Sequence, residues 1–119
     1  MLVIRRSQYV VAPGAYCFPG GGIEAGESAE GAVVREVAEE LGSTMRPVRE
    51  IWTSVSPWGV ELIWWLGRLD PQAVCTPHAA EVESFEWMTA AQMAELPSLL
   101  ESNRHFLEAL QRGIIDLTL

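Results

Sequence analysis

Positive charge is scarce in this chain of 119 residues, which has 8 Lys and Arg against 16 Asp and Glu and a net charge of −8. General binding to phosphate backbones or to anionic lipid surfaces depends on clustered Lys and Arg. The composition therefore argues against both, and we expect no nucleic-acid polymer and no membrane among the partners. An acidic chain that binds a phosphate-rich ligand would need a cation between the two.

Cysteine and long apolar runs are scarce as well. The two cysteines, Cys17 and Cys75, are not spaced as a metal-binding knuckle. The longest apolar run, Leu62 to Gly67, is far shorter than the roughly 20 residues that cross a bilayer. The first residues show no signal-peptide pattern. We therefore expect a cytoplasmic location and reduced thiols, with a disulfide left open.

Hydrophobic residues make up 49% of the chain, and the mean hydropathy is +0.13. These values are typical of a folded chain, and the length suits a single domain over residues 1–119. Strands are predicted at 1–6, 16–18, within 48–55, within 60–69 and at 82–87, with brief pairing at 9–11 left open. Helices are predicted from Ser28 to Gly42, after the capping box Thr89/Gln92, and from the capping box Ser98/Glu101 to Arg112. This order predicts an α/β sandwich with a mixed β-sheet.

The end of the first predicted helix carries three glutamates, Glu36, Glu39 and Glu40. Carboxylates are unfavourable at the carboxyl end of a helix, and Glu36 and Glu40 also repel each other as an i,i+4 pair. The three fall within about 100° of arc, beside the apolar stripe of Val33 and Val37. Taken alone they fit a solvated helix face. They also fit a site for a hard divalent cation, Mg²⁺ or Mn²⁺.

A glycine-rich loop, PGGGIEAGES from Pro19 to Ser28, comes directly before this helix. Glycines allow close approach of the backbone to a ligand, and loops that lead into helices often bind phosphates. The segment lacks both the GxxxxGK[ST] and the GxGxxG pattern, so by itself it is weak evidence.

Together the two segments resemble the Nudix box, G-x5-E-x7-R-E-U-x-E-E-x-G-U, where U is aliphatic, over Gly21 to Ser43. The matching residues are Gly21, Glu27, Arg35, Glu36, Val37, Glu39, Glu40 and Gly42. Ser43 departs from the pattern, since an aliphatic residue is usual there. The flanking segments Tyr16 to Gly21 and Glu81 to Trp87 also resemble the family.

The resemblance implies a Nudix-type α/β/α sandwich that hydrolyses a nucleoside diphosphate linked to another group X. It assigns Glu36, Glu39 and Glu40 as ligands of Mg²⁺ or Mn²⁺, with one glutamate as a general base. It further implies the roles of the remaining candidates: Gly20, Gly21 and Gly22 near the pyrophosphate, Glu27 and Arg35 as a structural pair, and Glu81 as an additional catalytic carboxylate, with Glu83 left open.

Several residues keep two interpretations. Arg5 and Arg6 end a strand that in the family runs near the substrate, so a phosphate contact and a surface salt bridge are both open. Tyr16, Phe18 and Trp58 are candidates for stacking on a base or for packing. Trp52, Trp64 and Trp65 are mostly core candidates, although one of the adjacent pair Trp64 and Trp65 could line a cleft because neighbours on a strand face opposite sides.

The start of the chain departs from the family, whose members usually carry another strand before the segment that resembles LVIRR. We therefore expect a sheet without that strand and a homodimer that covers the exposed N-terminal edge. The same departure, with Ser43, makes a catalytically impaired nucleotide-binding or regulatory module the alternative function. An acidic interaction domain is a third reading, and the intact set of glutamates favours the enzyme.

Overall fold

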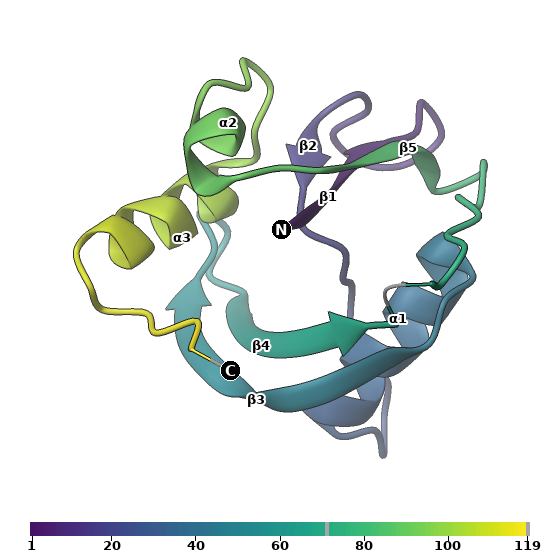
Figure 1. Ribbon diagram of the computed structural model, residues 1–119, viewed down its shortest axis with the longest axis horizontal. Coiled ribbons are helices and arrows are strands. Elements are labelled where there is room, and N and C mark those ends of the chain that lie inside the picture. The colour runs from purple at the N-terminus through teal and green to yellow at the C-terminus, as the bar shows by residue number, and fades with distance from the viewer. Residues whose placement is uncertain (71, 119) are drawn as a thin grey trace.

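Eight elements follow one another in the computed structural model, which describes residues 1–70 and 72–118 (Figure 1). The strands are β1 (Leu2–Arg6), β2 (Tyr16–Cys17), β3 (Met45–Val55), β4 (Glu61–Leu69) and β5 (Val82–Trp87), and the helices are α1 (Ala29–Leu41), α2 (Ala90–Ala94) and α3 (Glu101–Gln111).

Helix α1 has the bounds that the sequence predicts, because both of its ends are set by local contacts. The Oγ of Ser28 accepts the Gly31 N–H at 3.0 Å and caps the first turn. Gly42 ends the helix in the left-handed region, with φ of 63°, and donates its N–H to Ala38. Val37 and Leu41 are buried on the inner face.

The strands form two separate antiparallel sheets, in the order β2-β1-β5 and β3-β4. The turn at 56–59 joins β3 and β4 into the predicted hairpin. The prediction of one mixed sheet is wrong for the described residues, since their only parallel pairing is the isolated bridge of Tyr16 to Leu99. A short hairpin connection imposes antiparallel pairing on β3 and β4, and side-chain packing joins the two sheets.

Strand β1 is not an exposed edge. It pairs with β5 along its whole length and with β2 at Ile4 and Arg5. The uncovered edge predicted at the N-terminal strand is therefore absent. The pairing of β1 gives no support to the predicted homodimer that would cover this edge.

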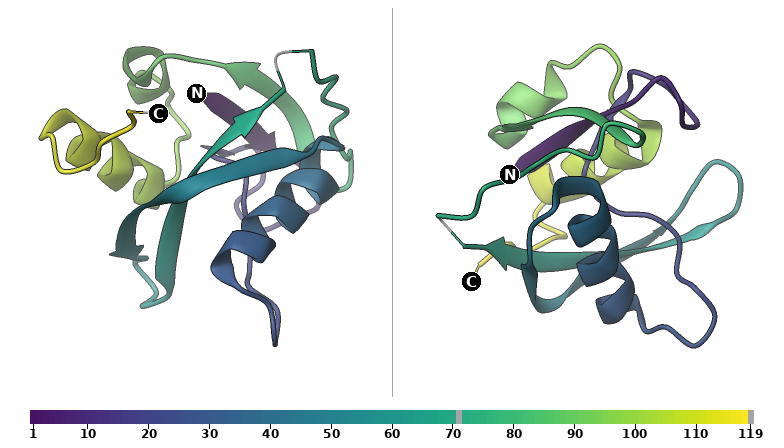
Figure 2. Two further views of the ribbon diagram at one scale, coloured as in Figure 1. Left: turned by 60° about the horizontal axis from the view of Figure 1, so that its bottom comes forward. Right: turned by 90° about the vertical axis from the view of Figure 1, so that its right-hand side faces the viewer.

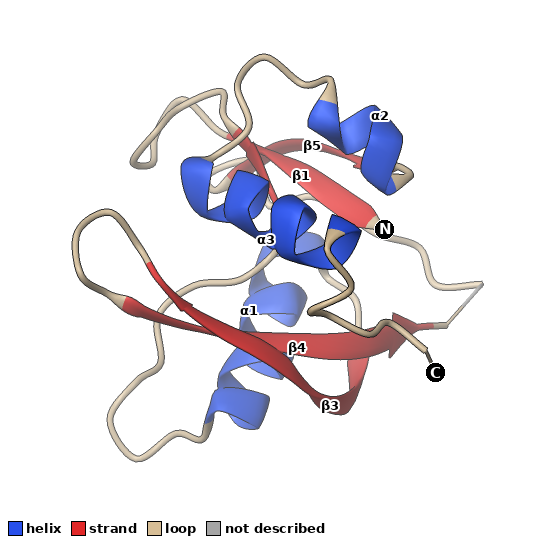
Figure 3. Cartoon of the chain, turned by 90° about the vertical axis from the view of Figure 1, so that its left-hand side faces the viewer, coloured by secondary structure: helices blue, strands red, loops and turns tan. Residues whose placement is uncertain are grey.

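Helices α1 and α3 lie on opposite sides of the strands, with α3 in front and α1 behind in Figure 3. One core cluster joins α1 to both sheets through Ile4, Cys17, Val37, Leu41, Met45 and Val82. A second, aromatic cluster joins α3 to the hairpin through Phe106, Trp52 and Trp64. Figure 2 shows the hairpin and the loop before α1 extending to the same side of the molecule.

The pairing left open at residues 9–11 does not form, and one local prediction is wrong. Residues 9–11 form turns and bends, since Gly14 donates its N–H to Arg6 and folds the segment back on β1. Helix α3 has Leu100 at its N-cap with no side-chain cap, and the Ser98 carbonyl accepts the Tyr16 N–H instead. The Ser98/Glu101 capping box is therefore absent.

Cys17 and Cys75 are free thiols. Burial raises the pKa of Cys17 to about 11, so this thiol stays protonated. Among the described residues no helix is long and apolar enough to span a membrane.

Candidate functional site

Glu40 is the most deeply buried carboxylate of α1, with 6% of its surface exposed. Its Oε1 accepts the Gly20 N–H at 2.8 Å, which joins the glycine-rich loop to the helix. Burial raises the pKa of Glu40 to about 8, with further contributions from the charges of Glu36 and Glu81, while the Gly20 N–H and Arg6 act in the opposite direction. The charges of Glu36, Glu81 and Arg6 therefore all act on the Glu40 carboxyl.

Glu36 and Glu39 are both held by Arg35. The Arg35 Nη1 lies 3.0 Å from Glu36 Oε1 and 3.2 Å from Glu39 Oε2. The Glu36 side chain is 15% exposed and that of Glu39 is 48% exposed, so Glu39 lies at the solvent side of the group. Burial raises the pKa of Glu36, and the charges of Glu39 and Glu81 add to the effect against the pull of Arg35.

The predicted pair of Glu27 and Arg35 is present and bidentate. Arg35 Nε donates to Glu27 Oε2 at 2.7 Å and Nη2 donates to Oε1 at 2.9 Å. The Arg35 hydrogen bonds hold the pKa of Glu27 at about 2. Arg35 Nη2 also donates to the Gly22 carbonyl at 2.8 Å, so one guanidinium fixes the loop on the helix.

Gly21 packs directly on Glu36. A Cβ at Gly21 would lie 2.5 Å from the Glu36 carboxylate, whereas one at Gly22 would meet no atom within 4 Å. The loop and the helix are thus close enough at Gly21 that only a glycine leaves the Glu36 carboxylate where it is.

The structure separates the two candidates for the additional carboxylate. Glu81 precedes β5, and its charge acts on both Glu36 and Glu40. Glu83 forms a surface pair with Arg5 at 3.2 Å. Glu81 is therefore the one whose charge reaches the glutamates of α1.

These carboxylates fit a hard divalent cation by chemistry, because they are oxygen donors that repel one another at close range. In this structure, however, their oxygens do not converge on a common metal position. Within residues 1–70 and 72–118, no group of three or more His, Cys, Asp or Glu side chains is arranged to hold a metal ion. Two of these carboxylates, Glu36 and Glu39, are instead paired with Arg35.

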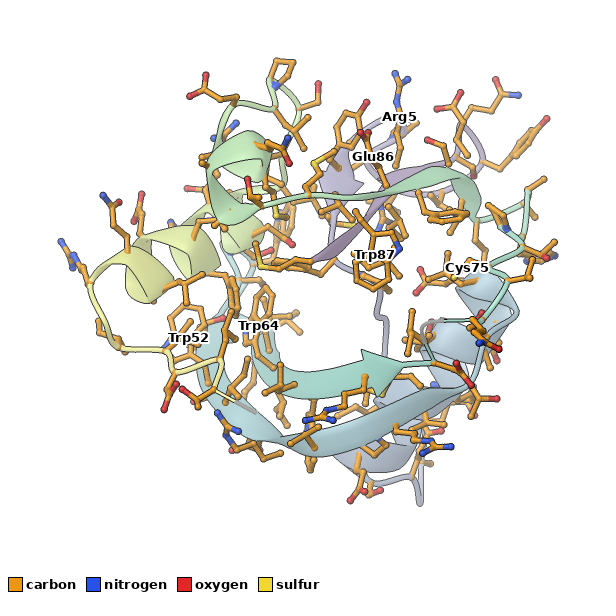
Figure 4. The ribbon with its side chains drawn as sticks, viewed as in Figure 1. Arg5, Trp52, Trp64, Cys75, Glu86 and Trp87 are labelled. Atoms are coloured by element: carbon orange, nitrogen blue, oxygen red, sulfur yellow. The ribbon has the colours of Figure 1, made fainter. Side chains whose placement is uncertain are left out.

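Of the two arginines that end β1, Arg6 lies at the site and Arg5 does not. Arg5 points outward (Figure 4), contacts Glu83 and lies 5.6 Å from the centre of the Tyr16 ring. Arg6 donates to the Val11 carbonyl at 2.6 Å and is close enough to lower the pKa of Glu40. Strand alternation indicates that two neighbours face opposite sides, but it does not say which one faces the helix.

Phe18 is half-buried and packs against the aromatic cluster of α3 and the hairpin. Its ring centre lies 5.1 Å from that of Phe106 and 6.0 Å from that of Trp64. Its N–H donates to Oδ1 of Asn103, a buried residue of α3 that sequence reasoning missed. The only signal for Asn103 was a polar residue on the inner face of an amphipathic helix.

The tryptophans divide between core and surface. Trp52 and Trp64 lie side by side next to α3 (Figure 4), with ring centres 5.9 Å apart. Trp58 is 83% exposed at the tip of the hairpin.

Two surface pockets are lined by none of the predicted site residues. One, of about 400 Å³, is lined by Leu69, Asp70, Ala73, Cys75, Phe85 and Trp87. The other, of about 290 Å³, is lined by Trp52, Ser54, His105, Glu108, Ala109, Arg112 and Ile114. Neither pocket is therefore lined by the carboxylates of α1.

The sequence is similar to known hydrolases of nucleotide-type compounds. It is 30% identical over 108 residues to the NAD-capped RNA hydrolase NudC of Pseudomonas aeruginosa, covering 91% of this chain and 38% of the relative. It is 47% identical over 58 residues to the RNA pyrophosphohydrolase of Vibrio cholerae, covering 49% of this chain and 34% of the relative. The chain thus spans less than two fifths of the length of these curated relatives.

Solved structures share the fold. A MutT protein of Methanosarcina mazei Go1 superposes with a TM-score of 0.78 and 25% identity, over 94% of this chain and 83% of that chain. An Ap4A hydrolase of C. elegans gives a TM-score of 0.74 at 17% identity, over 94% and 82% of the two chains. The NUDIX domain profile matches residues 1–110. With the α/β fold and the loop-to-helix contacts of Gly20, Gly21 and Arg35, these matches show that the chain belongs to the Nudix hydrolase family.

Proposed function

We propose that this chain hydrolyses the pyrophosphate bond of a nucleoside diphosphate linked to another group, with a divalent cation as cofactor. The observation that carries the proposal is the Glu40 carboxyl. It is buried, bonded to the glycine loop at Gly20, and placed beside the charges of Glu36 and Glu81. Such a group of like charges is unfavourable by itself and becomes favourable when a cation neutralises it.

Glu36, Glu39, Glu40 and Glu81 would hold Mg²⁺ or Mn²⁺. When bound, the cation would polarise the phosphoryl oxygens, lower the pKa of water and stabilise the leaving phosphate. No side-chain nucleophile is needed for this reaction. One of the glutamates accepts the proton of the attacking water, and Glu40 and Glu36 are the candidates whose pKa values are raised by burial.

The chain's other site residues position the substrate and the loop. Gly20, Gly21 and Gly22 place backbone atoms beside the carboxylates, where the pyrophosphate would lie. Arg35 and Glu27 fix that loop, and Arg6 supplies a positive charge next to Glu40. Arg5, Tyr16 and Phe18 are engaged in other contacts in this structure, so we assign them no direct substrate role.

One observation favours the alternative, a Nudix-fold nucleotide-binding or regulatory module. Arg35 binds Glu36 and Glu39, which leaves these carboxylates apart from a common metal position. A chain that keeps this arrangement in the presence of Mg²⁺ would bind nucleotides without turning them over.

A substrate screen tests the proposal. Relatives include enzymes named for NAD-capped RNA, nucleoside triphosphates and Ap4A, so dinucleotide cofactors, triphosphates and dinucleoside polyphosphates come first. Nucleotide sugars complete the set. We expect Mg²⁺- or Mn²⁺-dependent cleavage of at least one class and none with EDTA. Tight nucleotide binding by calorimetry without cleavage would establish the binding module instead.

A further inference from the structure

Ser7 is a buried polar residue directly after β1 that the proposed reaction does not use. Only 3% of its surface is exposed. Its Oγ donates to the Ala80 carbonyl at 2.8 Å and accepts the Tyr9 N–H at 3.2 Å. Its own N–H donates to the Glu81 carbonyl at 3.0 Å. Ser7 thus binds two consecutive residues of the segment that carries the additional carboxylate.

The other side of this segment is bound to α1. The Glu81 N–H donates to the His78 carbonyl at 2.9 Å, and the His78 N–H donates to the Glu40 carbonyl at 2.9 Å. A chain of backbone hydrogen bonds therefore runs from Glu40 through His78 to Glu81 and ends at Ser7. The backbone of Glu81 is held between the helix that carries Glu40 and the end of the strand that carries Arg6.

Firm positioning matters here because the side chains repel one another. The charge of Glu81 acts on both Glu36 and Glu40. Whenever these carboxyls are ionised, this repulsion favours a backbone shift that moves Glu81 away from the helix. The hydrogen bond from Ser7 to Ala80, and the bonds of Ser7 and His78 to the Glu81 backbone, oppose such a shift.

We propose that Ser7 is a positioning residue, whose hydroxyl holds the 80–81 backbone so that Glu81 takes part in cation binding with the glutamates of α1. The proposal rests on the proposed function, since it takes these carboxylates to be the metal ligands. It predicts that Ser7 influences the metal only through Glu81.

The test measures Mn²⁺ affinity of the metal-free full chain by isothermal titration calorimetry, without any substrate. The variants are Ser7→Ala, Glu81→Gln and the double variant. Ser43→Ala is the matched control, because Ser43 is also a buried serine whose Oγ donates to the same loop, to the Val74 carbonyl at 3.2 Å, but seven residues before Glu81. Thermal unfolding of each variant is recorded alongside.

We expect Ser7→Ala to raise the Mn²⁺ Kd about three- to tenfold, which corresponds to the net contribution of one hydrogen bond. Glu81→Gln should raise it at least as much, and the double variant should match Glu81→Gln alone. Ser43→Ala should change the Kd less than about twofold even where it lowers the Tm as much as Ser7→Ala does.

Two results would overturn the proposal. The first is independent effects, in which the fold-changes of Ser7→Ala and Glu81→Gln multiply in the double variant. The second is an equal weakening by Ser7→Ala and Ser43→Ala, which would reduce Ser7 to a general stabilising residue.

A nearly isosteric variant, Ser7→Cys, keeps the test decisive where Ser7→Ala fails to fold, because it keeps the packing and replaces the hydroxyl by a weaker donor. It should shift the Kd in the same direction, and an unchanged Kd would contradict the proposal. If the wild type binds Mn²⁺ and Glu81→Gln leaves the Kd unchanged, the proposed role of Ser7 is overturned while the proposed function stands. A wild-type chain that binds no Mn²⁺ would overturn the proposed function too.

Discussion

At the scale of single residues, the site depends on how closely the glycine loop approaches α1. The Cβ that Gly21→Ala introduces would lie 2.5 Å from the Glu36 carboxylate and displace it. Because the far end of a side chain can move, the fold should tolerate the change while Glu36 loses its position. We expect kcat/KM to fall about 10- to 100-fold with a Tm close to wild type, measured by phosphate release and thermal unfolding.

Gly22→Ala is the comparison for this prediction, since its added Cβ meets no atom within 4 Å. It should lose clearly less activity than Gly21→Ala. Equal losses would mean that loop flexibility, rather than contact with Glu36, sets the requirement for glycine.

A second prediction at the residue scale concerns Glu27. Glu27→Gln removes the charge of the bidentate pair that ties Arg35 to the loop. The Arg35 guanidinium should then shift toward Glu36 and Glu39, and a higher Mg²⁺ concentration should be needed for half-maximal activity. A Mg²⁺ titration of the rate measures this, and an unchanged midpoint would contradict the role of Glu27.

At the scale of elements, α1 has to remain a stable helix for its carboxylates to stay in place. Ser28→Ala removes the side-chain cap on Gly31 and should lower the free energy of unfolding by about 1 kcal/mol. Ser28→Asp should restore most of it, since aspartate is also a good N-cap. Urea denaturation measures both, and a full loss in Ser28→Asp would show that the cap is not the cause.

Elements whose ends are set locally could be predicted from the sequence, and those that depend on distant segments could not. Ser28 and Gly42 lie within the segment that they delimit, so the bounds of α1 follow from a few neighbouring residues. The position of β1 between β2 and β5 depends on pairing with residues about 80 positions away, such as Leu2 with Trp87. Local patterns carry no information on that pairing, and the mixed sheet was predicted wrongly for this reason.

The residues of the candidate site also differ in whether the local sequence predicts them. The pair of Glu27 and Arg35 follows from spacing along one segment, whereas the choice of Arg6 over Arg5 depends on the face that β1 turns toward α1. Ser7 and Asn103 act through bonds to Ala80 and Phe18, which are distant in sequence, so no local pattern marks them.

At the scale of the whole molecule, stability of the metal-free protein should depend on pH through the buried carboxyls. The folded-state pKa of Glu40 is raised to about 8 from an ordinary value of 4.5. The folded state therefore binds this proton more tightly than the unfolded state does. The stabilisation is complete below pH 4.5 and is lost as the pH rises through about 8.

The free energy of unfolding in EDTA should accordingly fall between pH 5 and 8, by up to about 1.4 kcal/mol per pH unit. Glu40→Gln should flatten this slope, because its amide does not titrate. Guanidinium denaturation at several pH values measures both. A stability that rises across this range in wild type would contradict the burial of Glu40.

Phosphate release from Glu40→Gln and Glu30→Gln, with Mg²⁺ and the best substrate of the screen, tests whether the glutamates at the end of α1 carry a metal-dependent hydrolysis. Glu30 is an exposed glutamate in the first turn of the same helix, so its variant removes the same charge away from the site. We predict a rate at least about 100-fold lower for Glu40→Gln and within about twofold of wild type for Glu30→Gln. Equal phosphate release from Glu40→Gln and wild type would contradict a role of these glutamates in the hydrolysis.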